Sequence, residues 1–523
     1  MNPLTVGQLY DRAVANGGDR IAITDGNRQI SYAELGKQAA RLVGAFAGLS
    51  IGRGERIAFL MANCAEYVAC EYAVAKLGAT RVPLAVLLGE EDHIYMINFA
   101  CCKVLVYHAK LQARVLAMQP RLETVEHFIR VGSGEAALPP GHFSLENLLS
   151  SGSPTQGATD IDPEEIAGIY FTGGTTGKPK GVMLSHRSWF YTYFMEMLDF
   201  GIGPRETFVF ATPMTHAGGC LILPVLLRQG RCVVLDRFEP NLLLSVIERE
   251  RATATLLIPT MIYVLLDYPQ RSEYDCSSLR NILYGASAIA PERLKQALQV
   301  FGPVFTQFFG QTEAPMALVA LQREDHTVAN PEREQVVLTS AGRPTYATEI
   351  RLVDETGRDV PSGEAGEVVA RAPNMMSGYL NDPEATAYAI RDGWLYTGDI
   401  ARFDDEGLIT IVDRKKDMIV SGGFNIYPRE VEDVLFEHPA VRQAAVIGIP
   451  HEKWGEEVKA LVVLQPGATT GERELLDFVK TRKGSVMTPK SIDFVDAIPL
   501  TNLGKMDKKA MRARYWDGRT RNV

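Results

Sequence analysis

A segment rich in glycine and threonine, residues 172–178, contains three glycines, three threonines and one lysine. Because glycine has no Cβ, such a segment lets backbone N–H groups and hydroxyls approach a phosphate closely. Lys178 adds a positive charge that attracts a polyphosphate. Apolar runs at 166–171 and 181–186 flank the segment, and each is typical of a buried strand. We expect a phosphate-binding loop between two strands, although composition alone would also fit a mobile surface loop.

The same segment departs from the Walker-type phosphate loop in two ways. Three residues, not four, separate Gly173 from the next Gly-Lys pair, and Pro179 follows Lys178 where a Walker loop has serine or threonine. Pro179 also disfavours a helix that begins directly after the lysine. We therefore expect the loop to hold a nucleotide tail without the helix dipole that a P-loop protein uses.

The size and charge of the chain narrow the function classes. Its 523 residues are too many for one hydrophobic core, so two or more domains are expected. The content of 46% hydrophobic and 22% charged residues is ordinary for a soluble globular enzyme. The net charge of -9 argues against a nucleic-acid-binding protein with a broad basic surface. It does not argue against small anionic ligands, which need only a local positive pocket.

Cysteine usage and hydropathy point to the cytoplasm. The seven cysteines show no C-x-x-C spacing, which favours reduced thiols and no zinc site. The N-terminus lacks the apolar core of a signal peptide. One window, 207–227, is uncharged over the length of a membrane span, but it contains two prolines, two glycines and a histidine. We expect a strand, a loop and the start of a buried helix there, not a membrane span.

The elements that must position the loop alternate between strands and helices. Hydrophobic spacing predicts helices at 30–49 and 65–79, the second ending at a glycine cap, with strands at 55–61 and 103–108. Residues 140–165 are rich in Ser, Gly, Pro and Asp, which predicts a connector. The alternation resumes over 231–301, the pattern of parallel sheets covered by helices. From Glu349 the pattern changes to strands and turns, and from Arg414 to a smaller α+β segment.

Five ordered segments together resemble the AMP-forming adenylating superfamily, which includes acyl- and aryl-CoA synthetases, peptide-synthetase adenylation domains and beetle luciferases. These segments are 170–181, 284–292, 307–315, 393–435 and 498–512, and the opening third matches at 30–36 and 52–63. The resemblance implies an α/β fold with a large N-terminal domain of helix-covered β-sheets and a β-rich subdomain, residues 1–413. It also implies a small, mobile α+β C-terminal domain, residues 414–523.

The resemblance implies a reaction in two steps. A carboxylate attacks the α-phosphorus of ATP, giving an acyl-adenylate and pyrophosphate, and a thiol, usually that of coenzyme A, then releases AMP. Mg²⁺ and hydrogen-bond donors would spread the charge of the leaving pyrophosphate. The residues expected to hold the β- and γ-phosphates are Thr172, Gly173, Gly174, Thr175, Thr176, Gly177 and Lys178.

The segment 307–315 offers an aromatic ring, a hydroxyl and a carboxylate within five residues. By the resemblance, Phe309 stacks on adenine, Thr312 donates to the α-phosphate and Glu313 ligates Mg²⁺. Family members usually carry tyrosine where this chain has Phe309, so stacking is kept and a hydroxyl contact is lost. Phe308 suits a core position as well as a pocket position.

Other segments are expected to complete the nucleotide site. Gly285, Ala286 and Ser287 match the family's adenine slot, although a buried strand–helix turn would need the same small residues. Asp399, expected on a turn after a strand, would accept both ribose hydroxyls, and Arg414 matches the second ribose contact.

The last expected residues act on the acid and the thiol. Lys505 matches the lysine that touches both the substrate carboxylate and the α-phosphate, where a cation removes the repulsion between two anions. Lys416 fits the hinge about which the C-terminal domain rotates, and Gly422 and Gly423 would let the pantetheine thiol pass. The acyl pocket is expected to be lined by Met214, His216, Gly285 and Gly310.

The sequence thus predicts a cytoplasmic ATP- and Mg²⁺-dependent carboxylic acid–CoA ligase. Three alternatives stay open: a ligase that loads a separate carrier protein's phosphopantetheine, a luciferase-like oxygenase, and a nucleotide sensor without turnover. Lys505 and Glu313 argue against the sensor. No charged residue is evidently aimed into the acyl pocket, so we expect an acid with an uncharged tail: aryl, cyclic, or short- to medium-chain.

Overall fold

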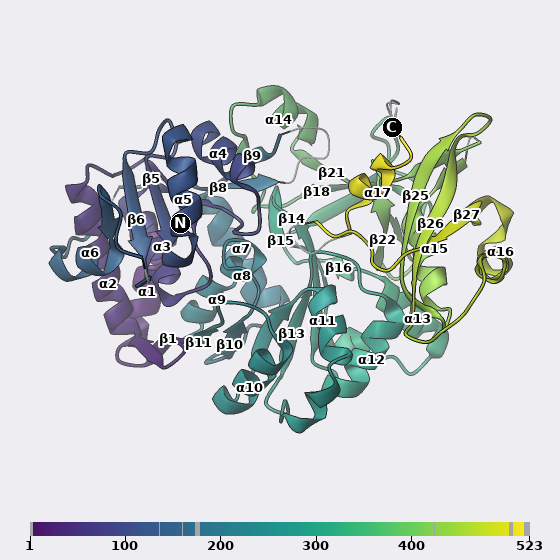
Figure 1. Ribbon diagram of the computed structural model, residues 1–523, viewed down its shortest axis with the longest axis horizontal. Helices are drawn as coiled ribbons and strands as arrows, with labels where there is room; N and C mark the ends of the chain where they lie inside the picture. Colours follow the sequence, from purple (N-terminus) through teal and green to yellow (C-terminus); the bar gives the residue numbers. More distant parts are fainter. Residues whose placement is uncertain are drawn as a thin grey trace.

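Four β-sheets organise the chain in the computed structural model, which describes residues 4–134, 136–158, 160–172, 178–422, 424–501 and 506–516. Two large sheets with their helices form the part of the molecule labelled α1 to α13, and a smaller sheet and the C-terminal elements lie at its other end (Figure 1). This mixed α/β architecture confirms the predicted fold class.

The eight-stranded sheet contains the two strands that flank the predicted phosphate loop. Its order is β19 (Gly378–Tyr379), β9 (Lys180–Ser185), β8 (Ile166–Thr172), β4 (Thr80–Pro83), β3 (Arg56–Leu60), β5 (Val104–His108), β6 (His127–Val131) and β7 (His142–Ser144). Strands β4 to β7 run parallel, and β8 and β9 form an antiparallel pair. The pairing of Thr172 with Lys180 closes the loop as a hairpin connection.

The nine-stranded sheet contains strands from both ends of the N-terminal region. Its order is β16 (Arg343–Pro344), β15 (Ala314–Leu321), β14 (Phe305–Gln311), β13 (Asn281–Gly285), β12 (Ala254–Leu257), β10 (Thr207–Phe210), β11 (Arg231–Val234), β1 (Ile21–Asp25) and β2 (Arg28–Ser31). β1 pairs in parallel with β11, with Ile23 opposite Cys232. The alternation seen in the first 165 residues is therefore divided between two sheets.

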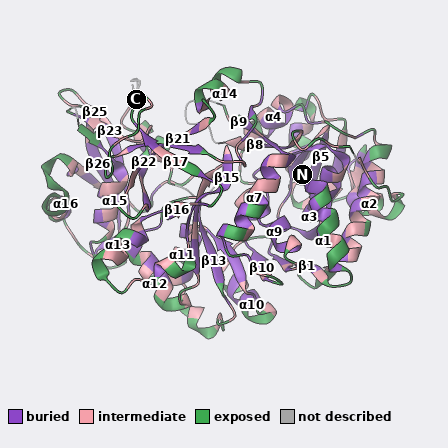
Figure 2. Cartoon of the chain, turned by 180° about the vertical axis from the view of Figure 1, so that it is seen from behind, coloured by how far each residue is buried: buried purple, intermediate pink, exposed green. Residues whose placement is uncertain are grey.

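Helices fill the space between these sheets and cover their outer faces. The central core includes buried residues of α1 (Val6–Gly17), α2 (Tyr32–Gly48), α3 (Ala65–Leu77), α7 (His186–Asp199) and α9 (Ile222–Leu227). The eight-stranded sheet packs its other face on α4 (Glu90–Phe99) and α5 (Gln112–Met118). The nine-stranded sheet packs on α10 (Pro240–Glu250), α11 (Pro259–Leu266) and α12 (Pro291–Phe301). In Figure 2 the strands between these layers are mostly buried, and α10 and α12 expose their outer faces.

Local sequence explains where the predicted helices begin and end. The Ser31 side chain accepts a hydrogen bond from Glu34 N, which caps the first turn of α2. Gly78 takes a left-handed conformation at φ 68°, as expected for the cap of α3. The expected connector 140–165 is only partly irregular, because β7 and α6 (Leu145–Ser151) lie within it.

The uncharged window 207–227 folds as predicted into β10, a loop and buried helices. These are α8 (Ala217–Cys220) and α9, and residues Ile222–Leu226 of α9 are buried. Among the described residues, no helix is long and apolar enough to span a bilayer.

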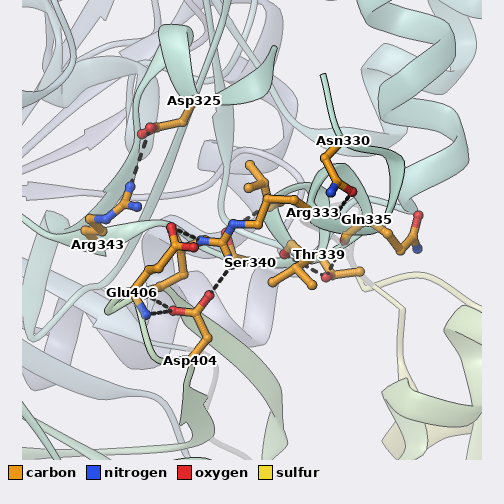
Figure 3. Close-up of polar contacts among 12 residues, drawn as sticks. Asp325, Asn330, Arg333, Gln335, Thr339, Ser340, Arg343, Asp404 and Glu406 are labelled. Atoms are coloured by element: carbon orange, nitrogen blue, oxygen red, sulfur yellow. Dashed lines mark hydrogen bonds and ion pairs between the residues drawn. The ribbon is translucent and has the colours of Figure 1, made fainter. Parts of the chain in front are cut away.

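The predicted change to strands after Glu349 produces a five-stranded sheet. It consists of β17 (Glu349–Val353), β18 (Gly366–Arg371), β21 (Trp394–Phe403), β20 (Ile390–Arg391) and β22 (Ile409–Arg414), with α14 (Pro383–Ala389) beside it in the sequence. Arg333 of α13 (Pro331–Thr339) binds Asp404 and Glu406 in the β21–β22 turn, with N–O distances of 2.6 and 2.7 Å (Figure 3). This contact ties the sheet to the helical layer that precedes it.

A second five-stranded sheet with its own core forms the C-terminal part. It consists of β24 (Phe424–Ile426), β23 (Ile419–Ser421), β26 (Gly455–Leu464), β25 (Val441–His451) and β27 (Ser491–Phe494), with α15 (Pro428–Phe436), α16 (Glu472–Met487) and α17 (Lys508–Ala513). Its core begins at Ile419, five residues after the end of β22. The domain division at residue 414 stays a prediction.

Candidate active site

The hairpin between β14 and β15 places Thr312 and Glu313 in its two-residue link, because Gln311 pairs with Ala314. The hydroxyl of Tyr379 donates a 2.7 Å hydrogen bond to Oε1 of Glu313. Since Tyr379 lies in β19 of the eight-stranded sheet, this bond joins the two large sheets. The Nζ of Lys180 lies 4.8 Å from the centroid of the Tyr379 ring. Tyr379 thus connects the Glu313 carboxylate to the strand that leaves the predicted phosphate loop.

The predicted phosphate loop begins after β8 and ends before β9, with no helix after it. Residues Gly173, Gly174, Thr175, Thr176 and Gly177 lie outside the described residues. Lys178 is exposed, and its Nζ lies 5.0 Å from the centroid of the Tyr95 ring on α4. The flanking geometry matches the expected loop between strands, and the phosphate contacts themselves stay a prediction.

The two phenylalanines of the 307–315 segment have different environments. Phe308 is 4% exposed, and its ring centroid lies 5.7 Å from that of Phe200, so it is a core residue. Phe309, the next residue of β14, is half-buried and packs at the edge of the same core. The aromatic face available to an adenine is therefore that of Phe309, and stacking remains a prediction.

The small residues of the predicted adenine and acyl sites are constrained by strand packing. A Cβ on Gly285 would collide with the carbonyl oxygen of Phe308, and a Cβ on Gly310 would lie 2.7 Å from the backbone of Met316. Ala286 takes φ 64° and Ser287 is exposed, in the turn after β13. The space on the Cβ side of Gly310, an expected acyl-pocket position, is thus filled by β15, beside a bulge in the ladder between Phe309 and Gln311.

The predicted ribose pair is assembled across two neighbouring strands. Asp399 lies inside β21, not on a turn as expected; the turn-like feature is Gly398, which takes φ 72° within the strand. Asp399 is the ladder partner of Arg414 at the end of β22, and its Oδ1 lies 3.5 Å from Arg414 Nε. The Asp399 side chain is 11% exposed and that of Arg414 is 53% exposed. The pair therefore presents a fixed carboxylate beside a cation that reaches into solvent.

Lys416 follows this pair directly and has an unusual environment. Burial, together with the nearby Arg414 cation, lowers the pKa of the Lys416 ammonium from 10.5 to about 8. The preceding Lys415 donates to Glu367 on β18, with an Nζ–Oε2 distance of 2.9 Å. The predicted hinge is therefore a half-buried, charged segment that packs on the five-stranded sheet containing β18.

The segment after the predicted catalytic lysine is bound to this hinge. Lys505 itself lies outside the described residues. In α17, Lys508 Nζ pairs with Glu432 at 2.9 Å and with Asp413 at 3.7 Å. Arg512 of the same helix pairs with Asp417 at 2.8 Å. The sequence reasoning missed these pairs, and the signal that could have indicated them is the run DRKKD, residues 413–417, in which two aspartates flank three cations.

The predicted thiol-access segment has an aromatic neighbour that sequence reasoning did not find. Gly422 takes φ 58°, and a Cβ there would lie 3.4 Å from the Trp454 ring. The Gly422 N–H donates to the Trp454 carbonyl at 2.9 Å, and the Trp454 ring stacks on His451 at 4.2 Å. Gly423 lies outside the described residues.

The predicted acyl-pocket residues Met214 and His216 lie in the loop between β10 and α8. Met214 is 1% exposed and belongs to the central core, whereas His216 is half-buried, with Nδ1 3.2 Å from the Thr215 hydroxyl. Asn63, which follows β3 in the other large sheet, holds this loop. It donates to the Thr212 carbonyl and accepts from Met214 N, both at 2.8 Å. Asn63 ends the segment 52–63 noted in the sequence, but nothing in that segment indicated this contact.

Comparisons with known proteins agree with this arrangement over the whole chain. The family model for AMP-binding enzymes matches residues 10–380, and that for the C-terminal domain of these enzymes matches residues 430–505. A medium/long-chain-fatty-acid–CoA ligase, FadD8 of Mycobacterium tuberculosis, is 39% identical over 100% of this chain and 92% of its own.

Two solved structures share the fold. The amide bond synthetase McbA from Marinactinospora thermotolerans has a TM-score of 0.89 and 33% identity, covering 97% of this chain and 99% of its own. The anthranilate CoA ligase AuaEII, in complex with anthranoyl-AMP, has a TM-score of 0.90 and 25% identity, covering 98% of each chain. The family predicted from the sequence is confirmed: the chain belongs to the AMP-binding enzymes.

Proposed function

We propose that the protein is an ATP-dependent carboxylic acid–CoA ligase. In the first step the acid's carboxylate oxygen bonds to the α-phosphorus of ATP and pyrophosphate leaves. In the second step the thiol of coenzyme A bonds to the acyl carbon of the adenylate, losing its proton, and AMP leaves. The family membership and the FadD8 and AuaEII relatives support this reaction.

One observation in the structure carries the proposal furthest. The hydrogen bond between Tyr379 and Glu313, with Lys180 beside the Tyr379 ring, brings three segments together. These segments are the exit of the Gly/Thr loop, the β14–β15 turn and the short strand β19. A nucleoside triphosphate needs cationic and hydrogen-bonding groups for its tail and a carboxylate for its metal ion, and these groups meet here.

The donor set at Glu313 suits Mg²⁺. This ion is usually held by one or two carboxylates together with substrate phosphates. Among the described residues no group of three or more His, Cys, Asp or Glu side chains could hold a metal by itself. Tyr379 binds only Oε1 of Glu313, so Oε2 can face a metal ion. Mg²⁺ bound there would neutralise phosphate charge, while Thr312 in the same turn donates to the α-phosphate.

The remaining groups divide between binding and charge stabilisation. Asp399 accepts from the ribose hydroxyls and Arg414 lies against the same sugar, because the two face each other across β21 and β22. Phe309 offers its ring to the adenine. Lys505 places its ammonium between the two reacting anions, which lowers their repulsion before the new bond forms.

The acid carries an uncharged tail. The loop expected to line the acyl pocket packs Met214 into the apolar core, so a second carboxylate would enter an environment with little to pair it. The relatives support this choice, since FadD8 is named for fatty acids and AuaEII holds anthranoyl-AMP. The seven cysteines are free, which supports a cytoplasmic location.

The proposal is tested by incubating the enzyme with ATP, Mg²⁺, coenzyme A and single acids from an aliphatic and aryl panel. We expect AMP, pyrophosphate and an acyl-CoA thioester in equal amounts for at least one neutral-tailed acid. Replacing coenzyme A with a phosphopantetheinyl carrier or an amine tests other acceptors, the amine being suggested by the likeness to McbA. Adenylate formation with thioester only on a carrier, light emission, or no turnover with any acid would overturn the proposal.

A further inference from the structure

A cavity of about 880 Å³ opens where strand ends of the two large sheets meet, and none of the predicted site residues lines it. From the eight-stranded sheet it is lined by residues that follow β3, β5 and β6, among them Asn63, Lys110 and Ser133. From the nine-stranded sheet it is lined by Asp25 at the end of β1 and Asp236 after β11. Its volume is in the range of sites that enclose a whole small molecule.

The cavity lies at a topological switch point. In the eight-stranded sheet β3 connects through α3 to β4 on one side, and β5 connects through α5 to β6 on the other. The carboxyl ends of β3 and β5 therefore diverge, and crevices of this kind bind ligands in open parallel sheets. Asn63 and Cys64 after β3, and His108 and Lys110 at the end of β5, line the cavity at this point.

The lining holds four carboxylates and four Lys or Arg cations, so what it can bind depends on which of these charges are already paired. Its carboxylates already have donors: Asp25 and Glu66 bind Arg28, and Asp236 binds Lys110. The fourth, Glu146, accepts from Gly132 N and from the Ser144 hydroxyl.

Arg130 on β6 differs from the other cations of the lining. Its Nη1 donates to the Gln112 side-chain oxygen and to the Ala136 carbonyl, which are neutral. It has no carboxylate partner among the described residues, and its buried Nε has no hydrogen-bond partner there. A guanidinium with neutral partners and unfilled donors is suited to a carboxylate or phosphate.

Asn63 connects this cavity to the loop predicted to line the acyl pocket. Its side chain lines the cavity, and the same amide holds the Thr212 carbonyl and the Met214 N–H. A molecule that contacts Asn63 from the cavity would therefore change the position of the 212–216 loop. This route needs no movement of the nucleotide-binding segments.

We propose that this cavity is a second ligand site, which takes a small anionic metabolite through Arg130 and acts on acid binding through Asn63. Binding of the anion at this site does not depend on the proposed function. The effect on acid binding does rest on the proposed function.

Binding is measured on the full-length enzyme by thermal shift, with inorganic phosphate and with citrate as probes. Excess AMP is present to fill the nucleotide site, and sodium chloride at matched ionic strength is the reference. We expect a saturable rise in Tm with at least one probe, and the probe that acts distinguishes phosphate from carboxylate chemistry. Arg130→Gln should weaken the apparent affinity at least about tenfold, because charge-assisted hydrogen bonds are lost.

Two further variants keep this test decisive. Arg121→Gln removes a half-exposed arginine that pairs with Glu91 outside the cavity, and it should bind the probe as the wild type does. Ser133→Glu adds a carboxylate at an exposed lining position and should abolish binding even if Arg130→Gln folds poorly. No saturable shift with either probe, or an affinity equal to that of the wild type in both the Arg130→Gln and the Ser133→Glu variant, would refute the site.

The coupling is measured by initial rates with and without the active probe. We expect a change in KM for the acid with little change in KM for ATP. Asn63→Ala should retain probe binding and lose this effect. If the probe binds but alters KM for the acid equally in both enzymes, the Asn63 route is wrong. If no acid is turned over, the proposed function fails, while the thermal-shift result still decides the site.

Discussion

Asp399 and Arg414 differ strongly in exposure, yet strand pairing holds them side by side. The carboxylate is buried by its strand and the guanidinium extends into solvent, although the two are ladder partners. The strand pairing fixes their separation before any ligand arrives, which would lower the entropy lost if the pair binds a ribose as we propose. The residues that follow, Lys415 and Lys416, lie in the turn after β22.

Lys416 should make the stability of the enzyme depend on pH. Its pKa is about 8 in the folded protein, below the ordinary lysine value of 10.5, so between these two pH values the unfolded chain binds more protons. The free energy of unfolding should therefore rise with pH through this window. Lys416→Met should stabilise the protein by about 1–3 kcal/mol at pH 7, with the difference shrinking above pH 8. Urea unfolding at several pH values measures this; a pH-independent difference would contradict it.

Lys505 should act in the first half-reaction alone. Its charge is needed only while two anions approach each other, so Lys505→Ala should slow adenylate formation by about 3 kcal/mol of activation free energy or more. Pyrophosphate exchange measures that step, and conversion of a presynthesised acyl-AMP to thioester measures the second, which should be retained. Equal loss of both steps would indicate a folding or docking defect instead.

At the scale of elements, the β14–β15 hairpin positions more of the candidate site than any other described pair of strands. Phe309, Gly310, Thr312 and Glu313 all lie in it, and its bulge turns the Thr312–Glu313 link toward Tyr379. The close approach of β15 to Gly310 shows that this glycine serves the bend itself. That Gly310 also lines the acyl pocket remains a prediction.

Gly310→Ala should therefore damage the hairpin, not the choice of acid. The new Cβ would lie 2.7 Å from the Met316 backbone, which cannot move without breaking the ladder. We expect a loss of about 1–3 kcal/mol in unfolding free energy and a fall in both half-reactions. Gly48→Ala, where a Cβ would meet nothing within 4 Å, is the matched control. A stable Gly310→Ala enzyme with an altered acid profile would restore the pocket role.

For the whole molecule, local sequence patterns predict the helices and strands better than the contacts between them. The paired strands that flank the Gly/Thr loop and the capped helix α3 follow from local patterns, and the structure places them as expected. The contacts of Asn63, Tyr379 and Lys508 could not be predicted, because each depends on a partner more than 65 residues away or in another sheet. Asp399 was misplaced because Gly398 imitates a turn inside a strand.

The pairing of β1 with β11 has a consequence for folding during synthesis, because the two strands are far apart in the sequence. Ile23 must wait for Cys232, so the first hairpin leaves the ribosome with one edge unpaired. At roughly 5–20 residues per second, that wait lasts about 10–40 s. On ribosomes stalled before β11 has emerged, trypsin should cleave readily at Arg20 and Arg28, and on released full-length protein it should not. Equal protection in both would show that the hairpin finds another early partner. During synthesis, the β1–β2 hairpin therefore stays incompletely paired until the residues of β11 have been added.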